Sequence, residues 1–448
     1  MDRRILDNDS RFIEDWRSIC MIPSVSRNVA ALDTARDWIV ERLTPLADTV
    51  TTVTLTGLGD VILGRIQGQS DRAITLYVHY DVQPEGDHDR WTHPPFGAEI
   101  HDGRMYARGA CDDKADVAAR LAALELWLED HQGTPPYTVI FIADPCEEIG
   151  SPGLRGVLEE HADALRSEGV LWESYLREED GRPSIGLGCR GVLEVELNLK
   201  LLTANQHPSY SQLLRSAPLE MMRTISSLTD AGGKITIPGF TDGALQPTAS
   251  AAERAATIAL PEEAIAMPGV NPFLSSNERQ RAVDFVYAPS MSVSRFDVDD
   301  AIRQSIAASC VARVRFGLVP GMHPESAFSA LSSHIQNLNP DIQVSLVRSM
   351  QPAYSPIGSG LADAVTVAAR KAFQSGEPQI YDVMTGAGPG SAFTDVLGSP
   401  IVSPSGTLRP DGNMHGYDEH GHTADFLTHI QFTLQILQEF EVTMGARS

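Results

Sequence analysis

Histidine and acidic side chains follow apolar, strand-like segments at separate places in this 448-residue chain. His79 and Asp81 end one such segment, Glu147 and Glu148 follow a second, and Asp112 comes directly before a helix-like segment. The carboxyl ends of parallel strands meet at one edge of an α/β sheet, and functional sites form there. We therefore expect these distant side chains to lie together in one polar site.

Each group also has an ordinary structural interpretation. A single histidine at a strand end is most often structural, an Asp-Asp pair often caps the following helix, and a Glu-Glu pair in a loop is usually solvated. These interpretations are unrelated, so they do not explain why all three groups follow successive strands of one sheet. A late histidine, His415, stands in another polar segment and is expected to join them. The combination favours a functional site.

The residue types indicate a site for two metal ions. Imidazole and carboxylate ligands without thiolates suit zinc, manganese or cobalt. The two oxygens of one aspartate can bridge two ions. In the pair Glu147-Glu148, one carboxylate can bind a metal ion while its neighbour accepts a proton from water. Asp81 can accept the second ring N–H of His79 and so fix the tautomer of the imidazole.

The segments around these residues predict the elements that position them. Val61–Ile66, Ile74–His79 and Thr138–Ala143 are rich in apolar and β-branched residues, and the third is apolar enough for a central strand covered on both faces. Ala115–Leu128 has apolar residues at helical spacing. This alternation predicts an α/β domain with a mainly parallel sheet and helices on both faces.

The pattern changes near residue 192. Leu193–Leu199 alternates apolar and polar residues, which is typical of a half-solvated antiparallel strand. From about residue 350 the α/β pattern returns. We therefore expect a discontinuous metal-binding catalytic domain over 1–192 and 346–448, interrupted by an inserted α+β domain over 193–345.

Composition narrows the class of function. The chain has 35 basic and 59 acidic residues, a net charge of −24. This charge disfavours nucleic acids and anionic membrane surfaces as partners. The five cysteines are scattered and never in CxxC spacing, so a reducing compartment is expected. No apolar run approaches 18 residues and the N-terminus has no apolar leader, so we expect a cytoplasmic protein.

Several strings together resemble a known enzyme family. HYDVQP at His79–Pro84, DDK at Asp112–Lys114 and EEIGS at Glu147–Ser151 are its most specific elements. Further strings follow in family order at Leu187–Leu193, Ile237–Phe240, Leu318–Gly321 and Met414–Glu419. The chain resembles the di-zinc metallopeptidases that include carnosinase, succinyl-diaminopimelate desuccinylase, aminoacylase and glutamate carboxypeptidase, and within them the dipeptidase branch.

The resemblance implies a ligand set for two divalent ions, with zinc expected first and manganese or cobalt as alternatives. The implied ligands are His79, Asp112, Glu148 and His415 within the family strings, and Glu173 in a strand-like segment outside them. Asp112 would bridge the ions. The fourth carboxylate is usually aspartate, and an ungapped count allows Ser174 at that position; Glu173 is chosen because serine is a poor ligand. The resemblance also implies a cis Asp112–Asp113 peptide bond.

Substrate contacts implied by the resemblance depart in part from the family pattern. His207 corresponds to a histidine that stabilises the oxyanion, although the residues after it differ. The family arginine that holds a substrate carboxylate is replaced by Gly317, and Arg315 is expected to substitute for it. The backbone of the loop Gly386–Ser391 would face the substrate through Gly388, Gly390 and Ser391.

The implied reaction is hydrolysis of the amide bond of a dipeptide or N-acyl amino acid. A water molecule bridged by the two ions would attack, with Glu147 as general base. The inserted domain would be a lid and dimerisation domain, so a homodimer is expected. Two alternatives stay open: a peptide-binding relative that has lost catalysis, and an Fe(II) oxygenase that uses His79 and Asp81 as part of a facial triad.

Overall fold

A computed structural model describes residues 1–260, 267, 269–299, 304–373 and 375–445. The chain divides into two compact units. The first unit contains Met1–Gly188, Tyr354–Asp382 and Pro389–Ser448, and the second contains Cys189–Ala353 and Val383–Gly388. No described helix combines the length and the apolar character needed to cross a membrane.

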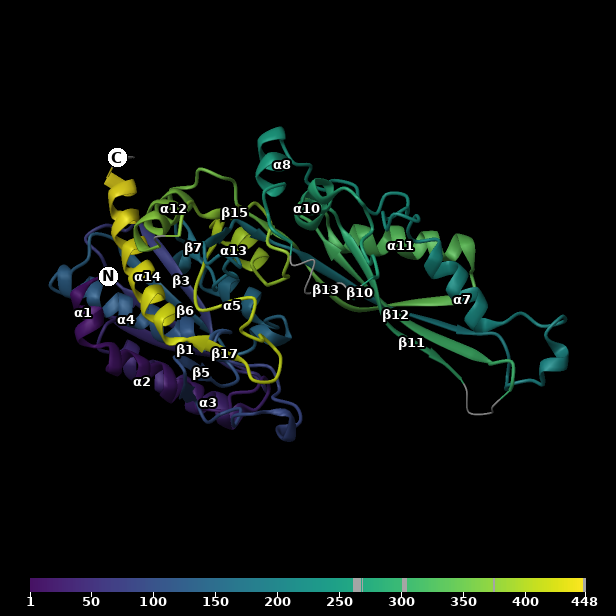
Figure 1. Ribbon diagram of the computed structural model, residues 1–448, viewed down its shortest axis with the longest axis horizontal. Helices are drawn as coiled ribbons and strands as arrows, with labels where there is room; N and C mark the ends of the chain where they lie inside the picture. Colours follow the sequence, from purple (N-terminus) through teal and green to yellow (C-terminus); the bar gives the residue numbers. More distant parts are fainter. Residues whose placement is uncertain (261–266, 268, 300–303, 374, 446–448) are drawn as a thin grey trace. The chain divides into compact units, whose positions relative to one another are not determined.

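An eight-stranded sheet forms the centre of the first unit (Figure 1). Its four middle strands are parallel to one another, and antiparallel pairing occurs where β2 joins β1 and β6 and where β16 joins β8. The strands in spatial order are β1 (Thr49–Leu55), β2 (Gly59–Ile66), β6 (Thr138–Asp144), β3 (Ala73–His79), β7 (Val170–Leu171), β16 (Ile401–Pro404), β8 (Ser184–Gly186) and β15 (Gln379–Tyr381).

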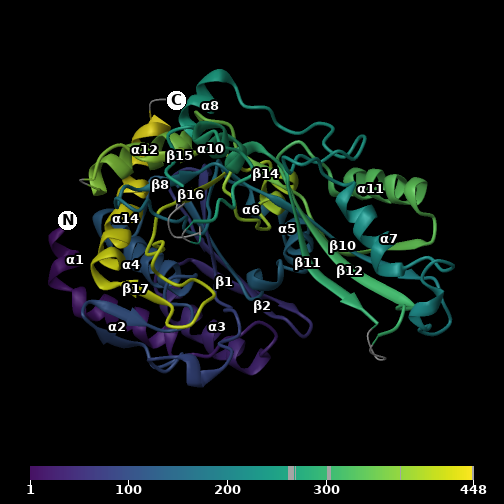
Figure 2. The same ribbon diagram turned by 45° about the vertical axis from the view of Figure 1, so that its right-hand side comes forward.

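Helices cover both faces of this sheet. Along β3, Ile74 and its alternate neighbours belong to a hydrophobic core shared with a layer of helices, of which α4 and α14 lie side by side (Figures 1 and 2). The longer helices of this layer are α2 (Asp9–Cys20), α3 (Val29–Leu43), α4 (Lys114–Asp130), α12 (Gly360–Ala372) and α14 (Thr423–Gly445). On the other face Tyr77 stacks on Trp172, 4.1 Å between ring centroids, and its ring meets the edge of Phe393 in α13 (Ser391–Val396). The α/β fold with a mainly parallel sheet is confirmed.

Shorter elements complete the first unit. A three-stranded sheet has the order β17 (His420–His422), β5 (Arg104–Tyr106) and β4 (Glu99–His101). The remaining described α-helices of this unit are α1 (Arg3–Asp7), α5 (Leu154–Glu160) and α6 (Ala162–Leu165). β17 leads directly into α14. The small sheet therefore connects the loop that precedes β17 to the helices that cover the large sheet.

The second unit is an antiparallel sheet with helices on one face. Its strands in spatial order are β11 (Ser290–Val298), β12 (Ser309–Leu318), β10 (Gly191–Lys200) and β13 (Ile342–Met350). Alternate residues of β10 and β12 are buried against α7 (Ala217–Ser226) and α11 (Pro324–Leu338), both visible beside the sheet in Figure 1. The opposite face carries ion pairs such as that between Arg313 and Glu196. Two further helices of this unit are α8 (Ala249–Ala255) and α10 (Glu278–Tyr287).

The limits of the two units differ from the domain limits expected from sequence. The prediction placed the inserted domain at 193–345, whereas the second unit runs from Cys189 to Ala353 and includes Val383–Gly388. The strand that signalled the change in pattern begins at Gly191, and the glycine-rich segment after β15 returns to the second unit. The lid and dimerisation role of this unit stays a prediction.

Candidate metal centre

Three neighbouring parallel strands bring the predicted residues to one edge of the large sheet. His79 is the last residue of β3 and pairs with Asp144, the last residue of β6. Glu147 and Glu148 follow in a short 3-10 helix, Glu147–Ile149. Glu173 follows β7, the strand on the other side of β3. The carboxyl ends of β6, β3 and β7 therefore carry these side chains to the same place, as the position rule for α/β sheets predicts.

Asp112 lies between two histidines. Its Oδ1 is 3.1 Å from Nε2 of His79, and its Oδ2 is 2.9 Å from Nε2 of His415. Asp112 stands in the loop before α4, and the peptide bond that joins it to Asp113 is cis, as the family resemblance implied. The two oxygens of one carboxylate thus point to two different imidazoles, which is the arrangement that a bridging ligand requires.

The other carboxylates divide between the two histidines. Glu173 Oε2 lies 3.5 Å from Nε2 of His79, and Glu148 Oε2 lies 3.2 Å from Nε2 of His415. Glu147 joins the His79 side, where its carboxylate, that of Glu173 and the imidazole have ligand atoms within 4.8 Å of one another. Asp112, Glu148 and His415 form a second group of the same size. The five proposed ligands and Glu147 form one cluster of oxygen and nitrogen donors, which fits two divalent ions.

Asp81 contacts both His79 and the Glu147-Glu148 turn. Its backbone carbonyl lies 3.1 Å from Nδ1 of His79, while its carboxylate Oδ1 is more distant at 3.4 Å. The carboxylate accepts hydrogen bonds from Ser26 Oγ at 2.6 Å and from the backbone N–H groups of Glu147 at 3.0 Å and Glu148 at 3.3 Å. The expectation that Asp81 accepts the second ring N–H of His79 stays a prediction, and its carbonyl is the nearer of the two possible acceptors. Asp81 orients His79 through its carbonyl and holds the Glu147-Glu148 turn through its carboxylate.

Two positioning residues were not singled out from the sequence. Gln83 donates from Nε2 to Glu148 Oε2 at 2.8 Å and from its backbone N–H to Oε1 at 3.1 Å. Trp172 donates from its indole N–H to Glu173 Oε1 at 2.7 Å. The Trp172 bond leaves Oε2 of Glu173 toward His79, whereas Gln83 bonds both oxygens of Glu148, including the Oε2 that lies beside His415. Gln83 lies within the HYDVQP string and Trp172 stands next to Glu173, so proximity to a ligand was the available signal.

The electrostatics of this cluster favour bound cations. Hydrogen bonds to Asp112 and then to Glu148 raise the pKa of His415 to about 10. Burial opposes the charged form of His79, but hydrogen bonds to Asp112 and Asp81 outweigh it and raise the pKa of this imidazole. Burial raises the pKa of Glu173 to about 7 and, together with the charge of Glu173, raises that of Glu147 well above its usual range. Protons on these imidazoles and glutamates neutralise part of the negative charge of the cluster. Divalent cations can supply the same neutralising positive charge.

Ser174 points away from the cluster. Its Oγ hydrogen-bonds to the carboxylate of Asp116 at 2.7 Å, and Asp116 pairs with Arg120 at 2.7 Å and with His429 at 3.1 Å. All three partners are buried in the first unit. Of the two adjacent candidates, Glu173 therefore lies beside His79 and Ser174 belongs to a structural network.

The substrate-binding candidates lie in different surroundings. In the second unit, His207 is exposed and precedes a 3-10 turn, and Arg315 is exposed on β12. Gly388 belongs to the second unit, and its carbonyl faces the thiol of Cys189. The loop prediction for Gly386–Ser391 is wrong at its end, because Ser391 is buried in the first turn of α13 and Gly390 directly precedes it. The predicted contacts of these residues with a substrate stay predictions.

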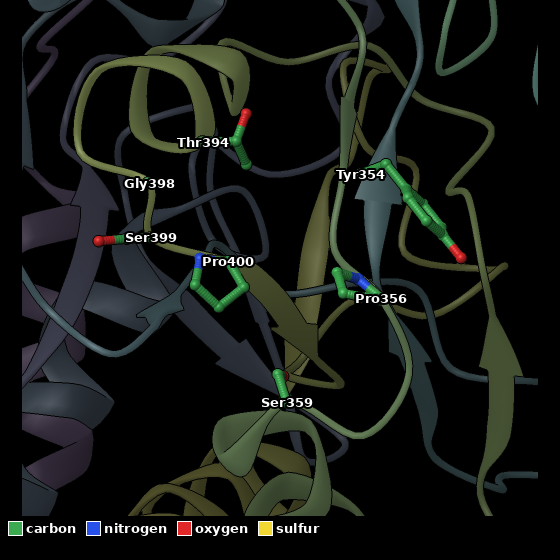
Figure 3. A pocket seen from close by; sticks show the side chains of 7 residues that line it. All are labelled: Tyr354, Pro356, Ser359, Thr394, Gly398, Ser399 and Pro400. Carbon is green, nitrogen blue, oxygen red and sulfur yellow. The ribbon is translucent and has the colours of Figure 1, made fainter.

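A pocket of the first unit contains none of these residues. Figure 3 shows its lining, which has no carboxylate, imidazole or thiol among its seven residues: Tyr354, Pro356, Ser359, Thr394, Gly398, Ser399 and Pro400. This pocket therefore adds no carboxylate, imidazole or thiol to the candidate metal centre.

Comparison with curated proteins gives distant but consistent relatives. The chain is 25% identical over 312 residues to the human Beta-Ala-His dipeptidase. This alignment covers 67% of this chain and 61% of that protein. It is 27% identical over 191 residues to the Cys-Gly metallodipeptidase dug1 of Schizosaccharomyces pombe, covering 41% of this chain and 40% of that protein. The alignments thus span less than two thirds of these relatives.

Solved structures resemble the fold over almost the whole chain. The M20 family metallo-carboxypeptidase Sso-CP2 from Sulfolobus solfataricus has a TM-score of 0.86 and 26% identity, covering 99% of this chain and 100% of that one. Human carnosine dipeptidase 1 shares the fold with a TM-score of 0.79 at 20% identity, covering 98% and 97%. The family model for Peptidase family M20/M25/M40 matches residues 75–439. The chain belongs to Peptidase family M20/M25/M40.

Proposed function

We propose that this protein is a dinuclear metallopeptidase that hydrolyses the amide bond of a dipeptide or an N-acyl amino acid. The observation that carries the proposal is the position of Asp112, whose two oxygens face His79 and His415 within a cluster of further carboxylates. Family membership supports the reaction class and disfavours the Fe(II) oxygenase alternative. Asp81, which that alternative needs as a ligand, uses its carboxylate to hold Ser26 and the Glu147-Glu148 turn.

The residues would hold the two ions in two groups that share Asp112. His79 and Glu173 serve one ion, and Glu148 and His415 serve the other. When bound, such ions lower the pKa of water and polarise the substrate carbonyl. Gln83 and Trp172 fix the carboxylates, and Asp81 fixes the imidazole of His79, so the ligands are oriented before binding.

Glu147 is the proposed general base. It is held beside Glu148 by the Asp81 carboxylate, and it lies within the His79 group without being one of the five proposed ligands. Burial, and then the charge of Glu173, raise the pKa of Glu147, which helps the carboxyl group to accept and keep a proton. Glu147 would take the proton of the attacking water and pass it to the nitrogen of the leaving amine.

The proposed substrate class follows the relatives whose names state dipeptidase activity. Chelator-treated protein is reconstituted with zinc, manganese or cobalt and assayed against dipeptides and N-acyl amino acids, with amine release as the readout. We expect no hydrolysis without metal and hydrolysis of at least one dipeptide with metal. A fully reconstituted protein that binds dipeptides and leaves all of them intact would instead support the peptide-binding alternative.

The ligand choice between adjacent residues gives a direct test. Glu173→Ala is expected to lose one of the two catalytic ions, because it removes the carboxylate beside His79. Ser174→Ala is the matched control and is expected to keep both ions, because Ser174 contacts Asp116. Elemental analysis of the purified variants measures the outcome. Unchanged metal content in Glu173→Ala would show that another residue provides this ligand.

His207 is the proposed oxyanion donor. Its Nδ1 accepts a hydrogen bond from the backbone N–H of Ser209 at 3.2 Å, so the neutral ring carries its proton on Nε2 and can donate it. His207→Ala is expected to lower turnover by about 10²–10³-fold, the usual effect of losing one oxyanion donor. Metal content should not change. An unchanged turnover number would remove His207 from the mechanism.

The proposed homodimer is tested with the same variant. If His207 acts on the centre of the partner subunit, mixing His207→Ala chains with Glu147→Gln chains creates hybrid dimers in which one centre has both intact residues. Partial recovery of activity after subunit exchange is expected. A monomer in solution, or no recovery after verified exchange, would contradict action between subunits.

A further inference from the structure

A second group of metal-ligating side chains lies on the three-stranded sheet of the first unit. His420 and His422 are alternate residues of β17, so their side chains share one face of the sheet. Asp411 stands in the loop before this strand. One ligand atom from each of the three side chains lies within 4.8 Å of the other two, and His422 Nε2 is 3.9 Å from Asp411 Oδ2. None of the three belongs to the candidate metal centre.

The ring nitrogens of this group are poorly satisfied. Nδ1 of His420 lies 3.0 Å from the backbone carbonyl of Asp418 and must donate to it, because a carbonyl only accepts. The neutral ring therefore has a lone pair on Nε2. His420 is only 5% exposed, and its Nε2 has no hydrogen-bond partner among the described residues. Nε2 of His422 is buried and lacks one within the same part of the chain. Two buried, unpartnered imidazole nitrogens near one carboxylate are what a metal ion would satisfy.

A neighbouring group, two of whose three residues lie on β4 of the same small sheet, provides a contrast. His93, Glu99 and His101 also lie close enough together for a metal ion. There, however, Nδ1 of His93 and Nε2 of His101 both reach Oε2 of Glu99, at 3.1 and 3.0 Å. Glu99 and His101 are also more exposed than His420. The hydrogen bonds of that group are satisfied without a metal, so it provides a control and not a second candidate.

We propose that Asp411, His420 and His422 bind a divalent transition-metal ion of the zinc type, additional to the two ions of the candidate metal centre. Two imidazoles and one carboxylate are ligands that zinc accepts, and three protein ligands leave a position for water.

One cation already approaches this group. Arg104 donates to Oδ2 of Asp411 at 3.3 Å, and its side chain is 40% exposed. The guanidinium neutralises part of the acidic charge and competes with a metal ion for that oxygen. Its exposure lets it turn toward solvent, and Oδ1 of Asp411 is a second oxygen available as a ligand. Arg104 should therefore weaken binding without blocking it.

The position of the group gives the ion a structural role. Asp411 precedes the loop 412–419 and His420 follows it, and this loop carries His415. The loop ends already meet through the bond from the backbone N–H of His420 to the carbonyl of Gly412. An ion bound by Asp411 and His420 would add a second link between the ends of the segment that presents His415.

The test is the number of zinc ions bound at a fixed free zinc concentration. The unmodified chain and the variants His422→Gln and Asp411→Asn are brought to equilibrium by dialysis and analysed by elemental analysis, with circular dichroism as the folding control. We expect each variant to bind one ion fewer than the unmodified chain. His101→Gln, the matched control from the neighbouring group, should bind the same number as the unmodified chain.

The test compares the zinc content of the unmodified chain with that of the variants. Its result therefore does not depend on how many ions the candidate metal centre holds. Equal zinc content in the unmodified chain, His422→Gln and Asp411→Asn would overturn the proposal. Loss of one ion in His101→Gln as well would also overturn it, because that result indicates unspecific binding to surface histidines. Asp411 is half-exposed, so Asp411→Asn keeps the test valid if His422→Gln does not fold.

Discussion

Glu147→Gln is expected to lower the turnover of dipeptide hydrolysis by roughly 10²–10⁴-fold, the range that a positioned general base contributes. Glutamine keeps the size of the side chain but cannot accept the proton of the attacking water. Metal content should stay as in the unmodified protein, because Glu147 is not one of the five proposed ligands. Steady-state kinetics combined with elemental analysis measures both quantities in the same sample.

The adjacent glutamate provides the control. Glu148→Gln changes the same atoms one residue along the chain, but Glu148 faces His415 and is a proposed ligand. It is expected to lose metal together with activity. Near-normal turnover in fully metallated Glu147→Gln protein would reject its role as base, and equal metal loss in the two variants would show that both glutamates are ligands.

Asp112→Asn is expected to have the largest effect of all. The substitution removes the negative charge that faces both His79 and His415, so both catalytic ions should bind more weakly. Loss of both ions removes several kcal/mol of stabilisation of the charge in the transition state. Turnover should therefore fall by about 10⁴-fold. The comparison is His415→Asn, which removes a ligand of one ion only.

Zinc titration of the two variants separates a bridging ligand from a terminal one. His415→Asn should keep one tightly bound catalytic ion, and Asp112→Asn should keep neither at the same free zinc concentration. Retention of one tight catalytic ion in Asp112→Asn would mean that Asp112 serves a single ion, and the proposal of a shared bridge would then be wrong.

Local strings predicted much of the candidate centre because its residues follow strands that the sequence shows clearly. His79 ends a wholly buried strand, and Glu147-Glu148 comes shortly after another, so both positions follow from apolar runs. Parallel pairing of β3 and β6 then places them at one edge. The mainly parallel sheet could be predicted for the same reason, since helix and strand alternate along this part of the chain.

Other features depend on three-dimensional packing that sequence patterns do not contain. Glu173 and Ser174 are adjacent after a two-residue strand, and only the packing of Asp116 shows which of them faces His79. The carbonyl of Asp81 contacts His79 because of the turn after β3, a detail without a residue-type signal. Similarly, His420 and His422 appear in sequence as ordinary alternating strand residues.

The most direct test of the proposed metal centre is anomalous diffraction at the zinc absorption edge from crystals of the zinc-reconstituted protein. The account predicts two strong peaks on either side of the Asp112 carboxylate, one beside His79 and Glu173 and the other beside Glu148 and His415. A single peak in this cluster, or zinc bound only elsewhere in the chain, would contradict the proposal of a two-metal site.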